Sequence, residues 1–565
     1  MRRHDFSGTA LLIAAAICTA TTASAAEFRA FWADAFHVGY KSSSQISSLV
    51  SRALTGNYNV IIVEVLAFHD TGPGGHGAYW NSGIVPKASD ISGNIDPLAE
   101  LITQAHANGI QVHAWIVSYR ASSTWPPSGN ATLSANPHWL MVPQADMGGG
   151  PAPVAGHYTL DPGSPDVQEY IVSIVRELAT NYDIDGINLD YIRYIQTDAG
   201  YPADTSYSKS SLARFQALTG FGGTPPPTGN TSWNDFRRQT IDELVRRLRA
   251  ELPSITGNPQ QPLWLTADLI TFGNAPSSFT SSDAYNLFQN WKFWMEQGYL
   301  DAGIPMNYKR ESSSSQANWY RNWVDAALNW SGDRHLVAGQ GNYLNKKSDS
   351  VTQMAYALAQ GADGACNFSY ASTADEDLNG TPEQDWSWYS YVASNLYTSP
   401  ASVPTLPWRN AATATEGTAW GRVYDDASGA PFDGATVQVG GLPAVQTDGN
   451  GYYVATLIPS SGGGSTYDVT ATAAGCPTGS VSNVLVPPGG IVRVDFALCP
   501  VTFPLGDMDE DGDIDAADFG LFSFCMLGPD VTFPGGNLCL QGDFDGDQDV
   551  DLSDFAGFQQ VFGTP

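Results

Sequence analysis

The stretch Asp183-Ile-Asp-Gly-Ile-Asn-Leu-Asp-Tyr-Ile-Arg-Tyr194 decides the fold that this sequence predicts. It has the pattern of a buried parallel strand that runs into a group of polar residues. Side chains alternate along a strand, so Asn188 and Asp190 share one face, opposite to the apolar side chains. In a parallel barrel that face points toward the axis, and barrel enzymes carry their chemistry at the carboxyl ends of the strands. Burying an unpaired charge is costly, so we interpret Asp190 as a catalytic carboxylate.

Further apolar runs of the same kind lie on both sides of this stretch and alternate with helical patterns. The expected strands span 28–36, 60–68, 111–117, 185–192, 263–270, 302–308, 335–341 and 364–370. Asp96-Pro97 and Ser164-Pro165 are typical helix starts, and 234–252, 350–360 and 385–397 are further expected helices. Eight strand–helix units over residues 26–397 predict an α/β domain, a (β/α)8 TIM barrel with enlarged loops. The alternative is an open doubly wound sheet, but the sequence lacks its glycine-rich first turn.

Residues 1–25 have the pattern of an export signal. Arg2 and Arg3 precede an apolar run at 10–20, and Ala23-Ser-Ala25 is a cleavage motif. The run is too short to span a membrane comfortably, and no later stretch is apolar enough to do so. We therefore expect a secreted protein whose mature chain begins near Ala26. Its expected location is extracellular or at the cell surface, with the periplasm as the alternative.

Composition narrows the classes of function. The chain has 565 residues, too many for a single core, so several domains are expected. Its formal net charge is −31, with 26 Lys and Arg residues in total. Binding a phosphate backbone needs clustered cations, so the charge argues against a nucleic-acid-binding protein. The 16 Trp and 25 Tyr residues are typical of proteins that stack on sugar rings, although large cores also use aromatic residues.

Three segments follow the barrel. Residues 398–417 are rich in Pro, Ala and Thr and have the composition of a linker. Residues 418–500 contain short alternating apolar runs between Gly, Asn and Asp turns, which predicts a small all-β sandwich that we interpret as a spacer. Residues 501–565 predict a small α-helical module with an EF-hand-like calcium motif.

This last segment contains the most specific motif in the chain. Aspartates occupy positions 1, 3, 5, 7, 9 and 12 of a loop that has Gly512 at position 6, and the spacing recurs about 36 residues later with Gln548 in place of the glycine. Ca²⁺ prefers hard oxygen ligands, and this spacing wraps a loop around the ion. We expect two structural Ca²⁺ sites and no cofactor for catalysis. The expected ligands are Asp507, Asp509, Asp511, Asp513, Asp515 and Asp518 in the first loop and Asp543, Asp545, Asp547, Asp549, Asp551 and Asp554 in the second.

The cysteines fit an oxidising compartment. Cys476 and Cys499 lie in the expected sandwich, and Cys525 and Cys539 lie in the calcium module, so two disulfides are expected. Cys366 falls on an expected buried strand, where a small apolar side chain needs no further role.

The expected strand ends offer carboxylates, amides and aromatic rings, but neither a serine elbow nor a phosphate-binding loop. Hydrolysis of a glycosidic bond needs one carboxylic acid and one carboxylate that acts as nucleophile or base. Asp190 is our first carboxylate, with a structural ion pair to Arg193 as the alternative. The acid is Asp268, on the next strand, or Glu64, whose apolar neighbours would raise its pKa as a general acid requires.

Other polar and aromatic residues at the strand ends are candidates for binding sugar. They are Trp32, Asp34, His113, Trp115, Asn188, Arg193, Asn307 and Tyr308. Asp34 and Asp301 are weaker candidates for the acid, and Asp301 lies near the amino end of its strand. His69, Asp70 and His76 match no compact metal-ligand spacing, so we interpret their loop as a sugar-contacting loop.

These residues together resemble the glycosyl hydrolase-like 10 family of bacterial TIM-barrel glycosidases. The resemblance implies an extracellular glycoside hydrolase that acts on a poly- or oligosaccharide, with Asp190 at the position of the Asp that ends the family's strand-4 motif. The chain departs from the family at Glu64 and Leu66, where Gln and Arg are frequent, and at Asn188, where His is frequent. The matching pieces are Phe28-Arg-Ala-Phe-Trp32, Ile95-Asp-Pro-Leu98, Gly109-Ile-Gln-Val-His-Ala-Trp115, Asp185-Gly-Ile-Asn-Leu-Asp-Tyr-Ile-Arg-Tyr194, Phe272-Gly273, Gly298-Tyr-Leu-Asp301, Pro305-Met-Asn-Tyr308 and the residues from Gly364 to Phe368-Ser-Tyr370.

Two further resemblances concern the segments after the barrel. Gly421-Arg-Val423 with Asp448-Gly-Asn-Gly-Tyr-Tyr453 resembles carboxypeptidase-regulatory-like modules. The Asp at position 12 of each calcium loop, followed by Phe519 or Phe555, resembles dockerin repeats and implies a cohesin-like protein partner. A calcium-stapled terminal domain with no partner is the alternative. For the whole protein, the alternatives to a hydrolase are a non-catalytic glycan-binding barrel and an assembly protein that acts through its tail.

Overall fold

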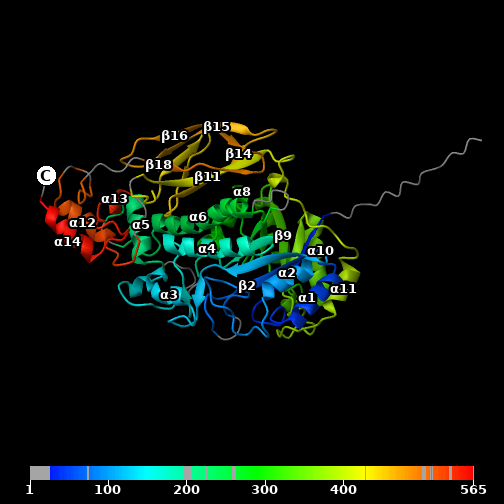
Figure 1. The fold of residues 1–565 in the computed structure, drawn as a ribbon. Helices are drawn as coiled ribbons and strands as arrows, with labels where there is room; N and C mark the ends of the chain where they lie inside the picture. The colour runs from blue at the N-terminus through cyan, green and yellow to red at the C-terminus, as the bar shows by residue number, and fades with distance from the viewer. Residues whose placement is uncertain are drawn as a thin grey trace, which may run out of the picture.

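The computed structural model describes residues 26–72, 76–195, 205–222, 225–256, 262–426, 428–498, 504–509, 511, 513–532 and 537–563. The expected export signal, residues 1–25, lies outside the described residues. A barrel carries a β-sandwich along one side and a small helical module at one end (Figure 1). Across the described residues, no helix combines the length and the apolar character that crossing a membrane requires.

The main domain is a closed barrel of parallel strands, which confirms the predicted TIM barrel. All eight expected strands are present, several of them shorter at their carboxyl ends because the chain turns there into long loops. Around the barrel they follow the order β1-β10-β9-β8-β7-β6-β3-β2. The strands are β1 (Phe28–Ala33), β2 (Val60–Leu66), β3 (Gln111–Val117), β6 (Gly186–Asp190), β7 (Trp264–Leu269), β8 (Ala302–Pro305), β9 (His335–Gly341) and β10 (Gly364–Phe368).

Helices cover the outside of the barrel, and their starts follow the expected signals. Asp96 accepts the backbone N–H of Ala99 and caps α2, which has Pro97 in its first turn. The serine-rich α1, absent from our expected helices, has a buried face that includes Ile46 and Leu49. The main helices are α1 (Ser43–Thr55), α2 (Pro97–His106), α4 (Pro165–Asn181), α6 (Thr231–Thr256), α9 (Ser314–Trp330), α10 (Lys347–Gln360) and α11 (Trp388–Asn395).

Shorter elements lie in the loops. The loop after β3 forms an antiparallel hairpin, and the loop after β6 contains a helix that contacts the C-terminal module. These elements are β4 (Arg120–Ser122), α3 (Ala131–Ala135), β5 (Tyr158–Thr159), α5 (Lys209–Thr219), α7 (Asp283–Asn286) and α8 (Trp291–Glu296).

Residues 398–417 pack under the amino end of the barrel, so they are more than the linker that their composition suggests. Leu406 and Trp408 join the apolar cluster that fills the lower barrel. Arg409 forms an ion pair with Asp301, which is fully buried. The segment therefore closes the bottom of the barrel and fixes the path of the chain into the next domain.

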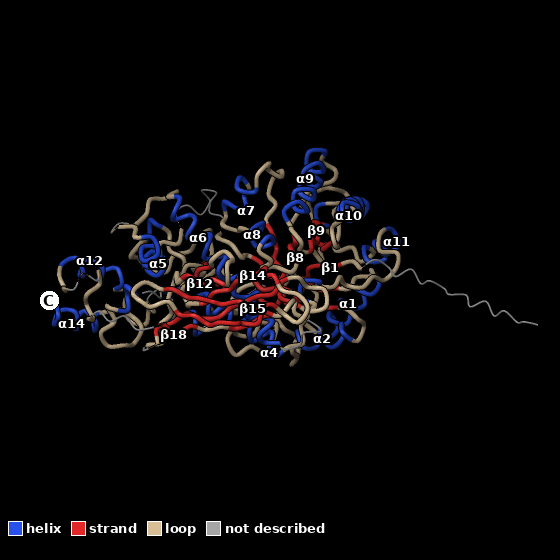
Figure 2. The backbone as a smooth tube through the Cα atoms, turned by 90° about the horizontal axis from the view of Figure 1, so that it is seen from above, coloured by secondary structure: helices blue, strands red, loops and turns tan. Residues whose placement is uncertain are grey.

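The next domain is the expected all-β sandwich, and Figures 1 and 2 show it lying along α6. The sandwich shares a buried interface with the barrel: Arg214, itself fully buried, pairs with Asp433 of the sandwich at 2.6 Å and with Glu243 of α6 at 3.2 Å. The role of the sandwich as a spacer stays a prediction. The sheet orders are β14-β11-β17, with β18 paired to β11, and β13-β12-β15-β16. The strands are β11 (Glu416–Asp425), β12 (Thr436–Val439), β13 (Val445–Gln446), β14 (Tyr452–Pro459), β15 (Ser465–Thr472), β16 (Gly479–Val486), β17 (Ile491–Arg493) and β18 (Phe496–Leu498).

The C-terminal module contains α12 (Ala516–Cys525), α13 (Asn537–Leu540) and α14 (Leu552–Val561). The disulfide between Cys525 and Cys539 joins α12 to α13, with an S–S distance of 2.09 Å, as expected. Cys499 lies outside the described residues, so its disulfide with Cys476 stays a prediction. The module contacts the barrel, since Lys209 Nζ of α5 donates to the carbonyl oxygen of Leu527 at 3.1 Å.

Candidate active site

Three strands of the barrel, β2, β6 and β7, carry carboxylates near its carboxyl end. The register aligns Glu64 on β2 with Trp115 on β3, and Trp115 with Asn188 on β6. Asp190 lies two residues beyond Asn188, at the end of β6, and Asp268 lies near the end of β7. The charge of Asp190 raises the pKa of both Glu64 and Asp268, and the charge of Glu64 raises the pKa of Asp268, so the three carboxylates form one electrostatic group.

Asp190 is buried, and its negative charge has several stabilising neighbours. Burial raises the pKa of its carboxyl, while the charge of Arg193 and the backbone N–H of Tyr191, which donates to Oδ1 at 2.6 Å, oppose the rise. In the described part of the chain no direct ion pair joins Asp190 to Arg193, whose guanidinium lies 4.5 Å from the centre of the Tyr191 ring. The structural ion pair therefore does not account for Asp190.

The pKa of Asp190 is raised on balance, and that of Asp268 is raised further. Burial raises the pKa of its carboxyl well above the ordinary value, and the charge of Asp190 raises it further. Asn188 donates to Oδ2 at 2.9 Å. Among the described residues, Oδ1 is buried and makes no hydrogen bond. Of the two aspartates, Asp268 therefore favours the protonated form more strongly than Asp190, whose charge Arg193 and the N–H of Tyr191 stabilise.

Glu64 is also buried, and burial raises the pKa of its carboxyl well above its usual range. Its Oε2 accepts the backbone N–H of Ala35 at 2.7 Å, which ties the loop after β1 to β2. This bond commits one oxygen to holding the loop. Asp268 also has one bonded oxygen, but the charge of Asp190 is the largest influence on its pKa after burial and is a lesser one for Glu64, so Asp268 is the acid more closely paired with Asp190.

Several expected sugar-binding residues surround these carboxylates. The indole N–H groups of Trp115 and Trp32 approach Asp190 and Asp268 respectively and lower their pKa values, although neither closes a full hydrogen bond. Tyr308 stands edge-on to Trp32, with ring centres 6.2 Å apart. Together with Asn188, Arg193 and the three acids, these residues gather near the carboxyl end of the barrel, where Trp32 and Trp115 are almost fully buried and Tyr308 is partly exposed.

The structure places two other expected residues elsewhere. His113 lies lower in the barrel, fully buried between Phe28 and Trp264, and burial lowers its pKa to about 3. Asn307 points outward and donates to the carbonyl oxygen of Tyr320 in α9 at 2.9 Å. Neither residue is in position to contact a sugar bound at the carboxylates.

Asp34 lies beyond the end of β1 and is held by its own loop. Its Oδ1 contacts the Nδ1 of His37 at 2.6 Å and accepts the backbone N–H of Phe36 at 3.0 Å. Burial raises the pKa of Asp34 and its contact with His37 lowers it, with a net lowering. A carboxylate in this condition keeps its charge and is unsuited to donate a proton.

Arg120 is a site residue that the sequence did not reveal. It belongs to β4, in the hairpin after β3, and its guanidinium lies 4.6 Å from the centre of the Tyr191 ring and 5.3 Å from that of Phe68. Its charge lowers the pKa of both Asp190 and Glu64. The position of this hairpin depends on tertiary packing, so the strand pattern contains no signal for it.

The loop after β2 is organised by its own polar residues. Asp70 is fully buried and contacts His76 Nδ1 at 3.0 Å and the hydroxyl of Ser122 at 2.7 Å. The ring of His76 stacks on Phe68, with centres 4.2 Å apart. His69, Asp70 and His76 are not among the candidate metal-holding groups found in the described residues. The loop thus presents Phe68 beside Arg120 at the edge of the site.

A cavity of about 1100 Å³ is remote from these carboxylates. It lies under the amino end of the barrel, where Asp185, Trp264 and Arg409 line it together with the turn at Pro487 of the sandwich. Barrel enzymes carry their chemistry at the opposite end, so the size of this cavity does not make it the active site.

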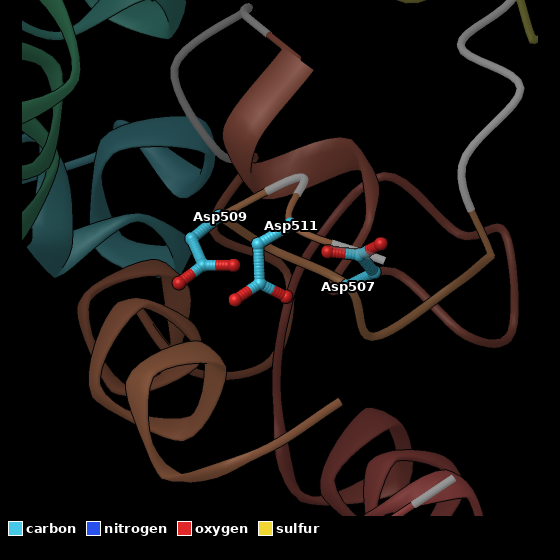
Figure 3. Close-up of side chains that lie close together, drawn as sticks. All are labelled: Asp507, Asp509 and Asp511. Atoms are coloured by element: carbon cyan, nitrogen blue, oxygen red, sulfur yellow. The ribbon is translucent and has the colours of Figure 1, made fainter. Parts of the chain in front are cut away.

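The aspartates of the C-terminal loops gather in groups that fit a metal ion. Figure 3 shows the first of them, with the side chains of Asp507, Asp509 and Asp511 on one loop. Within each group the ligand oxygens lie within 4.8 Å of one another. Asp551 belongs to no group and instead caps α14. The remaining groups are Asp513 with Asp515 and Asp518, Asp543 with Asp545 and Asp554, and Asp547 with Asp549 and Asp554.

Comparison with known proteins gives matches for two parts of the chain. Residues 27–350 match the family described as Glycosyl hydrolase-like 10, and residues 418–499 match the Carboxypeptidase regulatory-like domain. Glycosyl hydrolase DigH of Escherichia coli K12 is 28% identical over 269 residues, which are 44% of this chain and 56% of DigH. Glycosyl hydrolase YngK of Bacillus subtilis is 23% identical over 383 residues, covering 62% of this chain and 66% of YngK.

Solved structures give weaker likenesses. The endo-β-1,4-mannanase from Thermotoga petrophila is 15% identical, with a TM-score of 0.39, and the match covers 83% of this chain and 99% of that one. A TM-score this low supports no argument about function.

Proposed function

Because the chain belongs to the glycosyl hydrolase-like 10 family, we propose that it hydrolyses O-glycosidic bonds of a poly- or oligosaccharide. The observation that supports this proposal best is the contrast between Asp190 and Asp268. Two carboxyl groups with pKa values pushed apart are the arrangement that general acid catalysis beside a charged carboxylate requires.

In the proposed reaction, Asp268 protonates the oxygen of the leaving sugar and Asp190 acts as nucleophile or base. Arg193, Arg120 and the N–H of Tyr191 favour the charged form of Asp190. Asn188 donates to Asp268 and accepts the hydroxyl of Thr266 at 2.8 Å, so it keeps the acid in place. The partly exposed ring of Tyr308 supplies an apolar surface for a sugar, and the buried Trp32 and Trp115 hold their indole N–H groups toward Asp268 and Asp190.

The test is release of reducing sugars from a broad panel of polysaccharides by the full-length protein and by its Asp190→Asn variant. We expect activity in the parent and none in the variant, with both proteins folded. Glycans that bind to the parent without being cleaved would instead identify a non-catalytic glycan-binding barrel.

We further propose that the protein is exported and that its C-terminal loops bind two Ca²⁺ ions. The grouped carboxylates of each loop provide hard oxygen ligands at close range. Bound Ca²⁺ would neutralise part of their mutual repulsion and hold each loop against the helix that follows it. Isothermal titration of the chelator-treated protein with Ca²⁺ tests this, with two ions per chain as the expected result and no heat of binding as the contrary one.

A further inference from the structure

A smaller pocket, of about 200 Å³, opens at the carboxyl end of the barrel beside the corner between β1 and β10. It is formed by the loop after β1, by α1 and by the loop that follows β10. The residues that matter to its chemistry are Val38, Gln45, Ser48, Arg52, Tyr370 and Trp386. Its volume is below the roughly 300–1,000 Å³ of drug-sized sites, so it suits one small ring.

Aromatic rings and a guanidinium form one side of this pocket. The guanidinium carbon of Arg52 lies 3.6 Å from the centre of the Trp386 ring, and its Nη1 donates to the hydroxyl of Tyr370 at 2.5 Å. In the described part of the chain no carboxylate forms an ion pair with Arg52. Its planar head is therefore held flat, with donors left over for a ligand.

The other side of the pocket offers small polar groups. The Oε1 of Gln45 already accepts the backbone N–H groups of Gly39 and Lys41, at 3.1 and 3.0 Å, so its NH₂ end is the group left to bind a ligand. Ser48 is exposed, and Val38, with 43% of its surface exposed, adds an apolar edge. The pocket therefore combines the partly exposed Trp386, over which Arg52 is stacked, with several donors that can bind the hydroxyl groups of a sugar ring.

The pocket is coupled to the candidate active site through the backbone. The N–H of Tyr370, a residue of the pocket, donates to the carbonyl oxygen of Trp32 at 2.8 Å, and the indole of Trp32 approaches Asp268. Between the two sites the loop exposes Phe36, at 52% of its surface, which stands edge-on to Phe68. A glycan over the carboxylates can therefore continue across Phe36 toward Val38.

We propose that this pocket is a distal subsite that binds one sugar residue of a glycan chain, several residues away from the bond that is cleaved. The proposal rests on the proposed function and narrows its substrate class to extended glycans. A purely structural role for the pocket, in which Arg52 and Trp386 only fasten α1 to the loop before α11, predicts no effect of filling the cavity.

The variant Ser48→Trp separates these roles, because it fills the pocket and leaves Arg52, Tyr370 and Trp386 in place. Ser47→Trp is the matched control. Ser47 is also an exposed serine of α1, but its hydroxyl donates to Gln104 of α2 at 3.0 Å, so it faces away from the pocket. Thermal melting of both variants checks that the fold is retained.

The first readout is binding by full-length protein that carries Asp190→Asn, on an array of β-glucan, β-mannan, xylan, α-glucan and N-acetylglucosamine oligomers. Adding Ser48→Trp should weaken binding to the preferred long oligomers by about tenfold, while adding Ser47→Trp should not. The proposal is overturned if no class binds, if Ser48→Trp binds as well as the parent, or if both variants lose binding equally.

The second readout is hydrolysis by the same variants with Asp190 intact. Ser48→Trp should raise KM for the long oligomer, with kcat for it and all kinetics on its disaccharide unchanged. Absence of hydrolysis together with Ser48-dependent binding would refute the proposed function and keep the subsite. Hydrolysis of long oligomers with unchanged KM in Ser48→Trp would keep the function and refute the subsite.

Discussion

The two ends of the barrel bury carboxylates under opposite conditions. At the amino end, fully buried Asp301 accepts hydrogen bonds from Arg409, Trp408 and the backbone N–H of Leu265. At the carboxyl end, Asp268 is 2% exposed, has one hydrogen-bond donor within normal distance and faces a second negative charge. Burial raises the pKa in both places, yet the net shift is downward for Asp301 and upward for Asp268.

The difference teaches that counterions, and not burial, decide what a buried acid does. At Asp301 the charge of Arg409 is the largest opposing influence. Arg249 contributes less. The amino end therefore uses its acid to hold the chain together. At the carboxyl end no counterion pairs with Asp268 among the described residues, so its protonated form is favoured.

The largest expected effect is loss of hydrolysis in Asp190→Asn. Removing the nucleophile or base should lower kcat by about 10⁴-fold, the upper end of what acid–base groups contribute. The fold should be unchanged, because Asp190 makes no direct ion pair in the described part of the chain. Initial rates on the substrate found by the polysaccharide panel measure this. Asp301→Asn is the control, and equal loss of activity in both variants at a temperature where both are folded would break the comparison.

Asp268→Asn should lower kcat on natural glycosides by about 10³-fold, and less on aryl glycosides whose leaving group needs no proton. Because the pKa of Asp268 is raised, the parent should keep its acid protonated above the ordinary carboxyl range and lose activity only as pH rises through the raised value. That basic limb should be absent from the pH profile of the residual activity in the variant. If the basic limb persisted in the variant, the acid would be Glu64, and Glu64→Gln should then remove the limb.

Asp301→Asn should destabilise the protein by about 3 kcal/mol, because it leaves Arg409 buried without its partner. A lowered pKa stabilises the folded state above the ordinary pKa of Asp, near 3.9, and that stabilisation is lost as pH falls through the folded value. The free energy of unfolding should therefore fall more steeply below about pH 4 in the parent than in the variant. Urea unfolding at several pH values measures both effects, and parallel curves would show that Asp301 is not the group responsible.

The sequence predicts the barrel and its three acids because both follow from short-range pattern. Strand parity and parallel pairing place Asp190, Asp268 and Glu64 at one end without any knowledge of the loops. The alternation of side chains does not show, however, how far along the barrel axis a residue lies. His113 and Trp115 share a face, but two residues along a strand are about 6.6 Å, which is enough to put His113 in the lower barrel.

The remaining differences arise where the chain leaves the strands. Asn307 follows the end of β8 at Pro305, so alternation no longer fixes its direction. Arg120 reaches the site through a hairpin whose position depends on tertiary packing. The composition of residues 398–417 describes a linker, and nothing in it shows that Arg409 meets Asp301. Each of these contacts joins residues that are far apart in the sequence, so a local sequence pattern cannot predict it.

The smallest expected effect concerns a third set of acids, those of the C-terminal loops, where the proposed counterion comes from solution. Chelating Ca²⁺ with EGTA should lower the melting temperature of the C-terminal module by several degrees and change hydrolysis by the barrel by less than about twofold. Among the described residues, the contacts between the two regions, such as that of Lys209 with Leu527, involve none of the three barrel carboxylates. Asp511→Asn should remove one of two ions in a calcium titration. Asp333→Asn, at an exposed aspartate of the barrel domain, should remove none. If EGTA abolished hydrolysis, the calcium loops would be part of the functional site together with the carboxyl end of the barrel. Bound Ca²⁺ would then be required for catalysis as well as for folding.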